Sequence, residues 1–261
     1  MVGRFLFTAM CYNYETMIRT GIRRSIHQKG REETLASLSE EEKRIWFGER
    51  NTFETLNTDD EAKSQSTFPG AEVQVIPIDT RQREYYFFGF LPNWATSFND
   101  QRKNFNARSD SIRIKPTWKK AWKNKQRCLV CASGFYEDDK SNKKRYFFSV
   151  KDRAEIYFAG IYNHWKDPAT GQIAKTFAII TTEPNELVGS IHPRMPVILD
   201  KEGGVTWLKP QASEEAVFDL LQPFPAELME MNEAPKPPRK KKGGPELNLD
   251  FWIYYCYSLR Q

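Results

Sequence analysis

Short apolar and aromatic runs, separated by turn residues, recur along the chain from residue 71 onward, a pattern typical of β-strands. They lie at residues 73–76, 85–90, 127–130, 145–150, 156–161, 176–181 and 196–199. A helical pattern interrupts them at residues 117–124, and a closing helix is expected at residues 213–221. Most connections are too short for repeated parallel crossovers. The pattern therefore predicts an α+β fold with a largely antiparallel, barrel-like sheet and flanking helices.

The N-terminal part of the chain has a helical pattern instead. Ile18, Ile22 and Ile26 recur at helical spacing among arginines, so an amphipathic helix with a basic face is predicted over residues 16–30. A second, acidic helix is expected to follow it, and residues 51–70 are polar and rich in turn residues. These segments precede the first strand of the predicted sheet.

The sequence predicts one domain over residues 11–222, flanked by segments of different character. Residues 1–10 are expected to be an extension that is removed or not translated. Residues 223–261 are expected to be a Pro- and Lys-rich linker and tail of unknown role, because they combine several prolines with the basic run 239–242. The apolar segment 247–259 near the end has no physical explanation from its pattern.

Composition narrows the class of protein. The chain has 261 residues, enough to bury a sizeable core, and its formal net charge of +5 permits an anionic partner. It has no signal-peptide pattern and no apolar run long enough to cross a bilayer. Four cysteines are too few for a secreted disulfide scaffold, so a cytoplasmic location is expected, associated with the nucleoid in a bacterium. The Cys128–Cys131 pair lacks a second ligand pair, so no metal or other cofactor is expected.

Met10-Cys11 is the first candidate for chemistry. If the residues before Cys11 are removed, that residue carries a thiol and a free α-amine, a pair of nucleophiles that no internal cysteine has. The alternative is a buried, inert thiol that packs as a small hydrophobic residue.

Four further stretches carry candidate groups. They are the turn that contains Trp94, the segment Asn106-Ala107-Arg108-Ser109, the strand end Gly134-Phe135-Tyr136-Glu137, and the loop Ser190-Ile191-His192-Pro193-Arg194-Met195-Pro196. Asn106 and Arg108 are two apart and point to the same face in an extended chain. Taken singly, each stretch has a structural explanation: Trp94 as core, Asn106 as a turn residue, Glu137 as a surface charge and His192 as a satisfied loop histidine.

Taken together and in this order, the motifs resemble the SOS-response-associated peptidase (SRAP) domain family. The resemblance covers about residues 10–210, with Met-Cys, a W-G-L-x-P-x-W-like turn, N-A-R-x-E-like and G-F-Y-E-W-like motifs, and I-H-x-R-M-P. Three positions depart from the family pattern: Phe88 and Asp138 where tryptophan is common, and Asp110 where glutamate is common.

The start of the chain aligns with the family in two ways. Residues 1–5 resemble the common M-C-G-R-F opening, with Val2 in place of the cysteine. Cys11 is preferred as the family's cysteine, because Met10-Cys11-Tyr12 and the arginines that follow resemble an M-C-Y branch. If Val2 occupies the family position instead, the nucleophile has been lost.

The resemblance implies a protein that binds single-stranded DNA and shields abasic sites in DNA damage repair. The N-terminal Cys11 would form a thiazolidine with the aldehyde of the lesion. Asn106, Glu137 and His192 would complete the catalytic set, with Glu137 as base, His192 as proton donor and Asn106 as orienting group. The same set would support a self-processing hydrolase (protease) activity and a lyase-like activity.

DNA contacts are expected from arginines, lysines and one exposed aromatic residue. Arg108 and Arg194 are the predicted phosphate contacts. Trp94, Arg113, Lys119 and Lys120 are predicted to extend the site, and Trp118 and Trp122 are either interleaved stacking residues or core. No membrane and no obligatory protein partner are expected, and the protein is expected to be a monomer. Two alternatives remain: a cysteine peptidase acting on protein substrates, and a non-catalytic single-strand-binding module.

Overall fold

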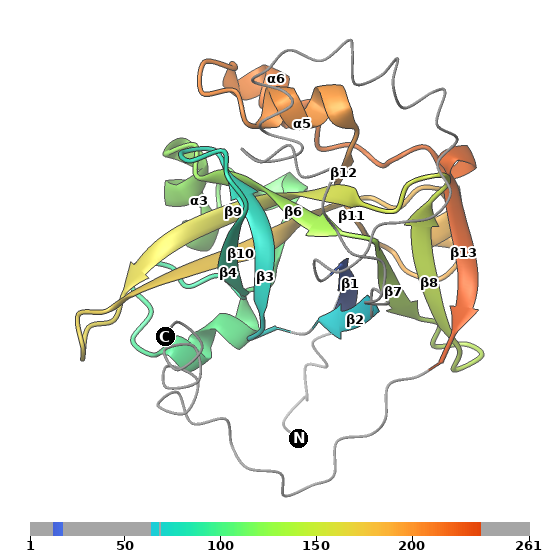
Figure 1. Cartoon of the computed structure of the whole chain (residues 1–261), viewed down its shortest axis with the longest axis horizontal. Coiled ribbons are helices and arrows are strands. Elements are labelled where there is room, and N and C mark those ends of the chain that lie inside the picture. Colours follow the sequence, from blue (N-terminus) through green and yellow to red (C-terminus); the bar gives the residue numbers. More distant parts are fainter. Residues whose placement is uncertain (1–12, 18–63, 68, 236–261) are drawn as a thin grey trace, which may run out of the picture.

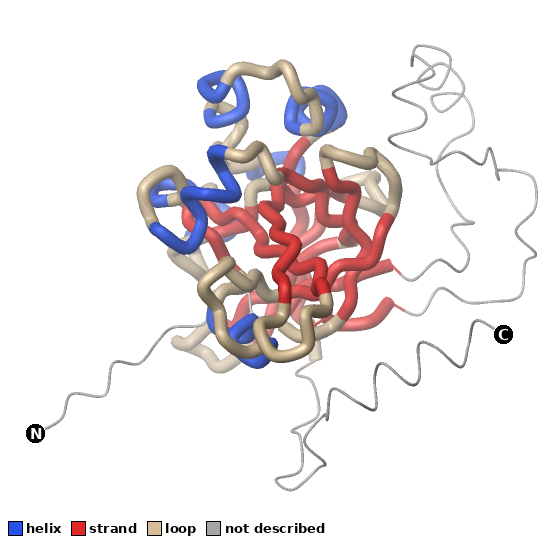
Figure 2. Tube along the Cα trace, turned by 90° about the vertical axis from the view of Figure 1, so that its left-hand side faces the viewer, coloured by secondary structure: helices blue, strands red, loops and turns tan. Residues whose placement is uncertain are grey.

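The computed structural model describes residues 13–17, 64–67 and 69–235. Cys11, most of the predicted basic helix, the acidic helix after it and the tail from residue 236 lie outside the described residues. Within them, strands form the centre of the molecule and short helices lie at its periphery (Figure 2). No helix of the described part is long and apolar enough to span a membrane.

Five strands close into a barrel in the order β10-β4-β3-β6-β9, with β9 pairing back to β10 (Figure 1). They are β3 (Glu72–Pro77), β4 (Glu84–Phe88), β6 (Arg127–Ala132), β9 (Ile156–Lys166) and β10 (Ile173–Thr182). All neighbouring pairs are antiparallel except β10 with β4. Every residue of β6 is buried, because this strand packs on both faces. The fold is therefore α+β with a largely antiparallel barrel, as predicted.

A second, five-stranded sheet has the order β13-β8-β7-β1-β2. Its strands are β1 (Asn13–Met17), β2 (Ser64–Thr67), β7 (Gly134–Asp138), β8 (Arg145–Val150) and β13 (Met229–Ala234). Because β7 follows β6 after a single residue, the barrel and this sheet share one continuous stretch of chain. Within this sheet, the first described strand, β1, pairs with β7, the strand that carries Glu137.

Three short strands are attached to the barrel. β5 (Asn106–Arg108) pairs in parallel with β10, β11 (Met195–Pro196) pairs with the end of β10, and β12 (Ile198–Leu199) pairs with β9. Two of them, β5 and β11, connect the Asn106 stretch and the His192 loop to the same barrel strand, β10.

The helices are short, and α4, α5 and α6 each begin with a side-chain cap. They are η1 (Phe98–Lys103), η2 (Ser109–Ser111), α3 (Pro116–Lys123), α4 (Glu186–Gly189), α5 (Lys201–Trp207), α6 (Glu214–Phe218) and η3 (Ala226–Leu228). The side chains of Asn185, Asp200 and Ser213 each accept a hydrogen bond from a backbone N–H of the first turn. These caps stabilise helices that are too short to persist by propensity alone.

Three features differ from the sequence predictions. Thr16 and Met17 belong to strand β1, so the basic helix does not begin at residue 16. Residues 229–234 form strand β13, so the segment expected to be linker contains sheet; Met229 and Met231 pack inward there and alternate with polar neighbours. Helix α5 was not predicted, because Gly203 and Gly204 weaken a helical pattern.

Candidate functional site

Glu137 and His192 form a buried pair in the described structure. Glu137 is near the end of β7, and His192 follows α4, where its backbone N–H donates to the Val188 carbonyl at 2.8 Å. The His192 Nδ1 and Glu137 Oε1 atoms are 3.8 Å apart, and each side chain is only 5% exposed. The structural explanation of Glu137 as a surface charge is therefore wrong. A carboxylate and an imidazole held together out of water are suited to acid-base chemistry.

The surroundings of the His192 ring favour a proton on Nδ1. That nitrogen lies 3.0 Å from the Arg194 carbonyl oxygen, and the Glu137 carboxylate is on the same side. The Arg194 N–H is farther away, at 3.3 Å. Nε2 is buried and has no hydrogen-bond partner among the described residues. A proton on Nδ1 leaves the Nε2 lone pair available to a bound molecule.

Burial lowers the pKa of His192 below its ordinary value, and it outweighs the hydrogen bond to Arg194, which raises the pKa. The positive charge of Lys140 contributes in the same direction as burial. The imidazole is therefore neutral near pH 7. A neutral ring can take up a proton at the start of a reaction and release it later.

Strand β1 leads from the N-terminal segment to this pair. Asn13 lies opposite Tyr136 in the antiparallel β1–β7 register, and Tyr136 precedes Glu137. Strand β7 begins at Gly134. A glycine is needed at this position because a Cβ would collide with the Phe148 carbonyl oxygen and the Phe147 ring. Cys11, two residues before Asn13, lies outside the described residues.

The barrel strand β10 brings the Asn106 and His192 stretches together. In the parallel pairing, Asn106 lies beside Ile179 and Arg108 beside Thr181. The Thr181 carbonyl accepts a 2.6 Å hydrogen bond from the Arg194 guanidinium. Residues far apart in the chain, from β5 and from the His192 loop, thus converge at the carboxyl end of one strand.

The two arginines of the site are held by two carboxylates. Arg108 Nε donates to Asp110 at 3.1 Å, and this hydrogen bond holds the pKa of Asp110 below its ordinary value. Arg194 donates to Glu183 at 2.7 Å and lies 3.6 Å from Asp110. Arg194 is buried, whereas the Glu183 side chain is 71% exposed. The positive charge of both guanidinium groups is therefore locally balanced.

A comparison with models of known protein families gives a match to this chain. The model of the SOS response associated peptidase (SRAP) family matches residues 23–236, which include Asn106, Glu137 and His192. The chain belongs to the SRAP family.

Curated relatives carry names that refer to DNA lesions. The abasic site processing protein YoqW of Bacillus subtilis is 37% identical over 147 residues, which are 55% of this chain and 65% of that protein. The abasic site processing protein HMCES of Xenopus tropicalis is 29% identical over 147 residues, 46% of this chain and 43% of that protein. The chain thus matches less than two thirds of the length of these two relatives.

Solved structures have the same fold. A Bacteroides thetaiotaomicron protein is 32% identical, with a TM-score of 0.60 over 64% of this chain and 76% of that chain. A Bordetella bronchiseptica protein, at 21% identity, aligns with a TM-score of 0.63 over 87% of this chain and the whole of that chain. The second similarity concerns the fold alone.

The remaining predicted DNA contacts of this SRAP chain differ in exposure. Trp94 is 63% exposed, so the structural explanation of it as core is wrong. Lys119 and Lys120 are exposed on α3. The Arg113 guanidinium lies 3.7 Å from the centre of the Phe218 ring. Trp118 and Trp122 belong to the core, so they do not offer stacking surfaces between the lysines.

Glu183 was not singled out from the sequence of this SRAP chain, although it contacts Arg194. It follows a buried strand and precedes a proline, a pattern that predicts a turn and no particular chemistry. Its role in the site depends on a contact across eleven positions of the chain, which no local pattern encodes.

The Cys128–Cys131 pair of the SRAP barrel is structural. Both thiols are buried in β6, and burial raises the pKa of Cys131 to about 12. Among the residues that the structure describes, no group of three or more His, Cys, Asp or Glu side chains could hold a metal ion.

Proposed function

We propose that this SRAP protein binds single-stranded DNA and forms a covalent crosslink between Cys11, as the N-terminal residue, and the aldehyde of an abasic site. One observation carries the proposal: Glu137 of the buried Glu137–His192 pair lies on β7, the strand that pairs with β1, and β1 begins two residues after Cys11. The names of the curated relatives, which refer to abasic site processing, support the choice of lesion.

The reaction follows from the two nucleophiles of an N-terminal cysteine. The α-amine condenses with the ring-opened aldehyde to give a Schiff base and one molecule of water. The thiol of the same residue then adds to the carbon of the C=N bond, and the nitrogen takes up a proton. The product is a five-membered thiazolidine. Closure is intramolecular and gains the advantage of a reactant that is already in position.

His192 and Glu137 supply proton transfer. The α-amine has an ordinary pKa of about 7.7 to 8.0, so much of it is protonated at neutral pH and needs a base. Glu137 takes this proton. During ring opening, the Nε2 atom of neutral His192 accepts the proton of the C1 hydroxyl group and returns it to the ring oxygen of the sugar. Asn106 orients the N-terminal residue through its amide.

For the two arginines to bind DNA, phosphate groups must replace the carboxylates that now contact their guanidinium groups. Arg108 and Arg194 are paired with Asp110 and Glu183 in the described structure. A phosphate group accepts the same bidentate hydrogen bonds from a guanidinium group, so the strand exchanges one anion for another at these positions. Lys119, Lys120 and Arg113 add sequence-independent attraction, and Trp94 supplies a stacking surface.

Self-processing is part of the same proposal. Cys11 has a free α-amine only when no peptide bond joins it to Met10. Hydrolysis of this bond by the Cys11, Asn106, Glu137 and His192 set would expose the amine, in keeping with the peptidase in the family description.

The proposal is tested with an oligonucleotide that carries a single abasic site. The wild-type protein is expected to give an adduct that survives heating in denaturant, and Cys11→Ala is expected to give none. An unchanged adduct yield in Cys11→Ala would sink the proposal. Turnover of a peptide without any DNA adduct would support a peptidase acting on proteins, and salt-sensitive binding without a covalent product would support a non-catalytic binding module.

A further inference from the structure

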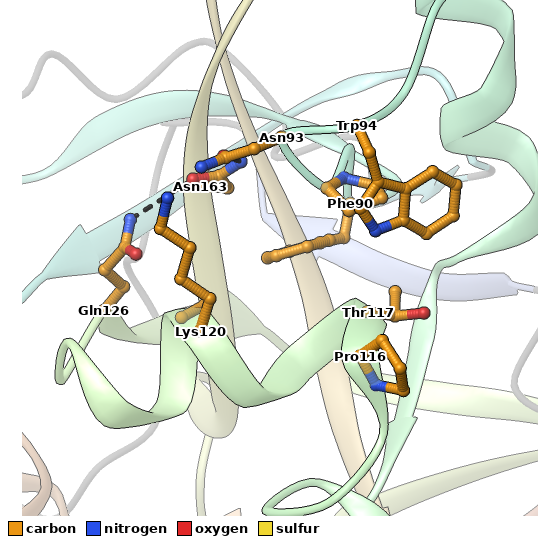
Figure 3. A pocket seen from close by; sticks show the side chains of 10 residues that line it. Phe90, Asn93, Trp94, Pro116, Thr117, Lys120, Gln126 and Asn163 are labelled. Carbon is orange, nitrogen blue, oxygen red and sulfur yellow. Dashed lines mark hydrogen bonds between the residues drawn. The ribbon is translucent and has the colours of Figure 1, made fainter.

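A pocket beside Trp94 is lined by polar groups that the reaction does not use. It lies between the turn after β4 and helix α3, and its polar lining consists of Asn93, Thr117, Lys120, Gln126 and Asn163. In Figure 3, Lys120 points from α3 toward Asn93 and Asn163, while the Trp94 indole lies over the other end, near Pro116 and Thr117. The pocket thus combines an aromatic face with a polar edge.

Asn163 fixes the orientation of two neighbouring amides. Its Nδ2 atom donates to the Leu91 carbonyl at 2.7 Å and to Asn93 Oδ1 at 2.8 Å. Its Oδ1 atom accepts a longer, 3.4 Å hydrogen bond from Gln126 Nε2. Asn163 is buried and has both ends of its amide engaged, so it sets the direction of the other two.

The network leaves a defined set of hydrogen-bonding groups. The Asn93 amide nitrogen and the Lys120 ammonium group make no hydrogen bond within the described residues, so the pocket presents two donors. Gln126 uses its nitrogen toward Asn163, which leaves its carbonyl oxygen as an acceptor. A ligand that complements this edge has an exposed oxygen acceptor next to an N–H donor.

We propose that this pocket is a nucleobase subsite that prefers keto bases, thymine and guanine, over amino bases, cytosine and adenine. Thymine presents O4 beside N3–H, and guanine presents O6 beside N1–H, so both complement the two donors and the Gln126 oxygen. Cytosine and adenine present an exocyclic amine beside a ring nitrogen acceptor, the reverse arrangement. Trp94 stacks on any of the four bases, and the polar edge of the pocket distinguishes keto bases from amino bases.

The position of the pocket connects it to the reaction. Phe90, which lines the pocket, donates its backbone N–H to the Asn104 carbonyl at 2.8 Å, and Asn104 is two residues before Asn106. The inference rests on the proposed function, because it assigns the bound base to the same DNA strand as the lesion. It gives the protein a preference for the bases that flank an abasic site.

The test compares strands that differ in the keto or amino character of their bases. Two pairs of undamaged single strands of about ten nucleotides are used: all-dT against all-dC, and alternating dT-dG against alternating dC-dA. Ring size is matched within each pair, so stacking does not decide the result. Fluorescence anisotropy is expected to show that the keto strand of each pair binds at least about fivefold more tightly than the amino strand. A factor of about five is the lower end of the discrimination given by a hydrogen-bonded base contact. Equal affinities within both pairs would overturn the proposal.

Two variants and a matched control sharpen the test. Asn93→Asp keeps the acceptor for Asn163 and replaces the outward donor by an acceptor, so the ratio is expected to shift toward the amino strands. Lys120→Met is expected to reduce the preference. Lys119→Met, one position away and outside the pocket lining, is expected to weaken binding of all four strands equally. An unchanged ratio in both Asn93→Asp and Lys120→Met would also overturn the proposal.

The failure of the subsite is distinguishable from the failure of the crosslinking function. Base preference is measured on undamaged strands, where no covalent bond forms. Adduct yield is measured separately on all-dT and all-dC strands that carry one abasic site. A base preference without adduct would refute the crosslink and leave the subsite standing, whereas adduct without a base preference would refute the subsite alone.

Discussion

The Glu137 Oε1 and His192 Nδ1 atoms lie 3.8 Å apart inside the protein, although 55 positions separate the two residues in the chain. If Glu137 acts as a base, Glu137→Gln is expected to slow adduct formation by about a hundredfold or more, the usual contribution of a positioned acid or base. The matched control is Asp138→Asn, which removes the neighbouring, exposed carboxylate and should leave the rate close to wild type. Single-turnover adduct kinetics measure both, and equal rates for Glu137→Gln and wild type would exclude this role.

The ionisation of His192 is accessible to NMR titration. Burial lowers its pKa, so the titration midpoint is expected below about 6.5. The Lys140 charge also lowers it, so Lys140→Met should raise the midpoint, whereas Lys143→Met in the same turn should not move it. A wild-type midpoint at or above 6.5 would contradict the description of the site.

The same shift predicts how stability depends on pH. The unfolded imidazole has the higher pKa, so the unfolded state binds more protons below about pH 6.5. The contribution of His192 to the free energy of unfolding is therefore fully present above that pH and is lost as the pH falls. Denaturant titrations of wild type and His192→Gln should show a smaller loss on acidification in the variant; parallel curves would refute the prediction.

Glu183 competes with DNA for Arg194. Its exposed carboxylate holds the guanidinium group at 2.7 Å, so Glu183→Gln is expected to tighten single-strand binding. The slope of log K against log salt should become steeper by up to about 0.7, the value for one additional phosphate contact on a single strand. Glu186→Gln removes an equal charge from an exposed position of α4 and serves as the control. Identical salt slopes for the two variants would show that Glu183 does not mask the site.

Gly134 is expected to be essential for the β7 strand. A Cβ at this position would collide with the Phe148 carbonyl oxygen and the Phe147 ring, so Gly134→Ala should lower the free energy of unfolding by about 1 to 3 kcal/mol or more. Gly189→Ala, where the added atom meets only Pro184 at 3.5 Å, is the control. Chemical denaturation compares the two, and equal stabilities would mean that β7 tolerates a side chain there.

Much of the fold was predictable because the barrel strands have strong local patterns. The strand at residues 145–150 was predicted with its observed bounds, and helix α3 differs from its prediction by one residue at each end. Helix α5 and strand β13 were not predicted, since glycines obscure the first and a Pro-rich context obscures the second. Their stability comes from an Asp200 cap and from pairing with β8, both of which depend on the folded structure.

The candidate site was predictable as a set of residues but not as a geometry. The motifs predict Asn106, Glu137 and His192 as candidates. The β5–β10 register places Asn106 beside the end of β10, and tertiary packing brings Glu137 within 3.8 Å of His192. The ion pair of Arg194 with Glu183 and the amide network around Asn163 could not be predicted, because each joins groups from separate loops and strands. For Trp118 and Trp122, local spacing was compatible with both a stacking surface and a core, and packing decided for the core.

The central claim is that Cys11 reacts through its own amine and thiol. The most direct measurement is the intact mass of the purified protein before and after incubation with an abasic single strand. The prediction is a chain that begins at Cys11 and an adduct whose mass equals protein plus oligonucleotide minus one water. A chain that still carries residues 1–10 and forms the adduct, or a chain that begins at Cys11 and forms none, would contradict the claim.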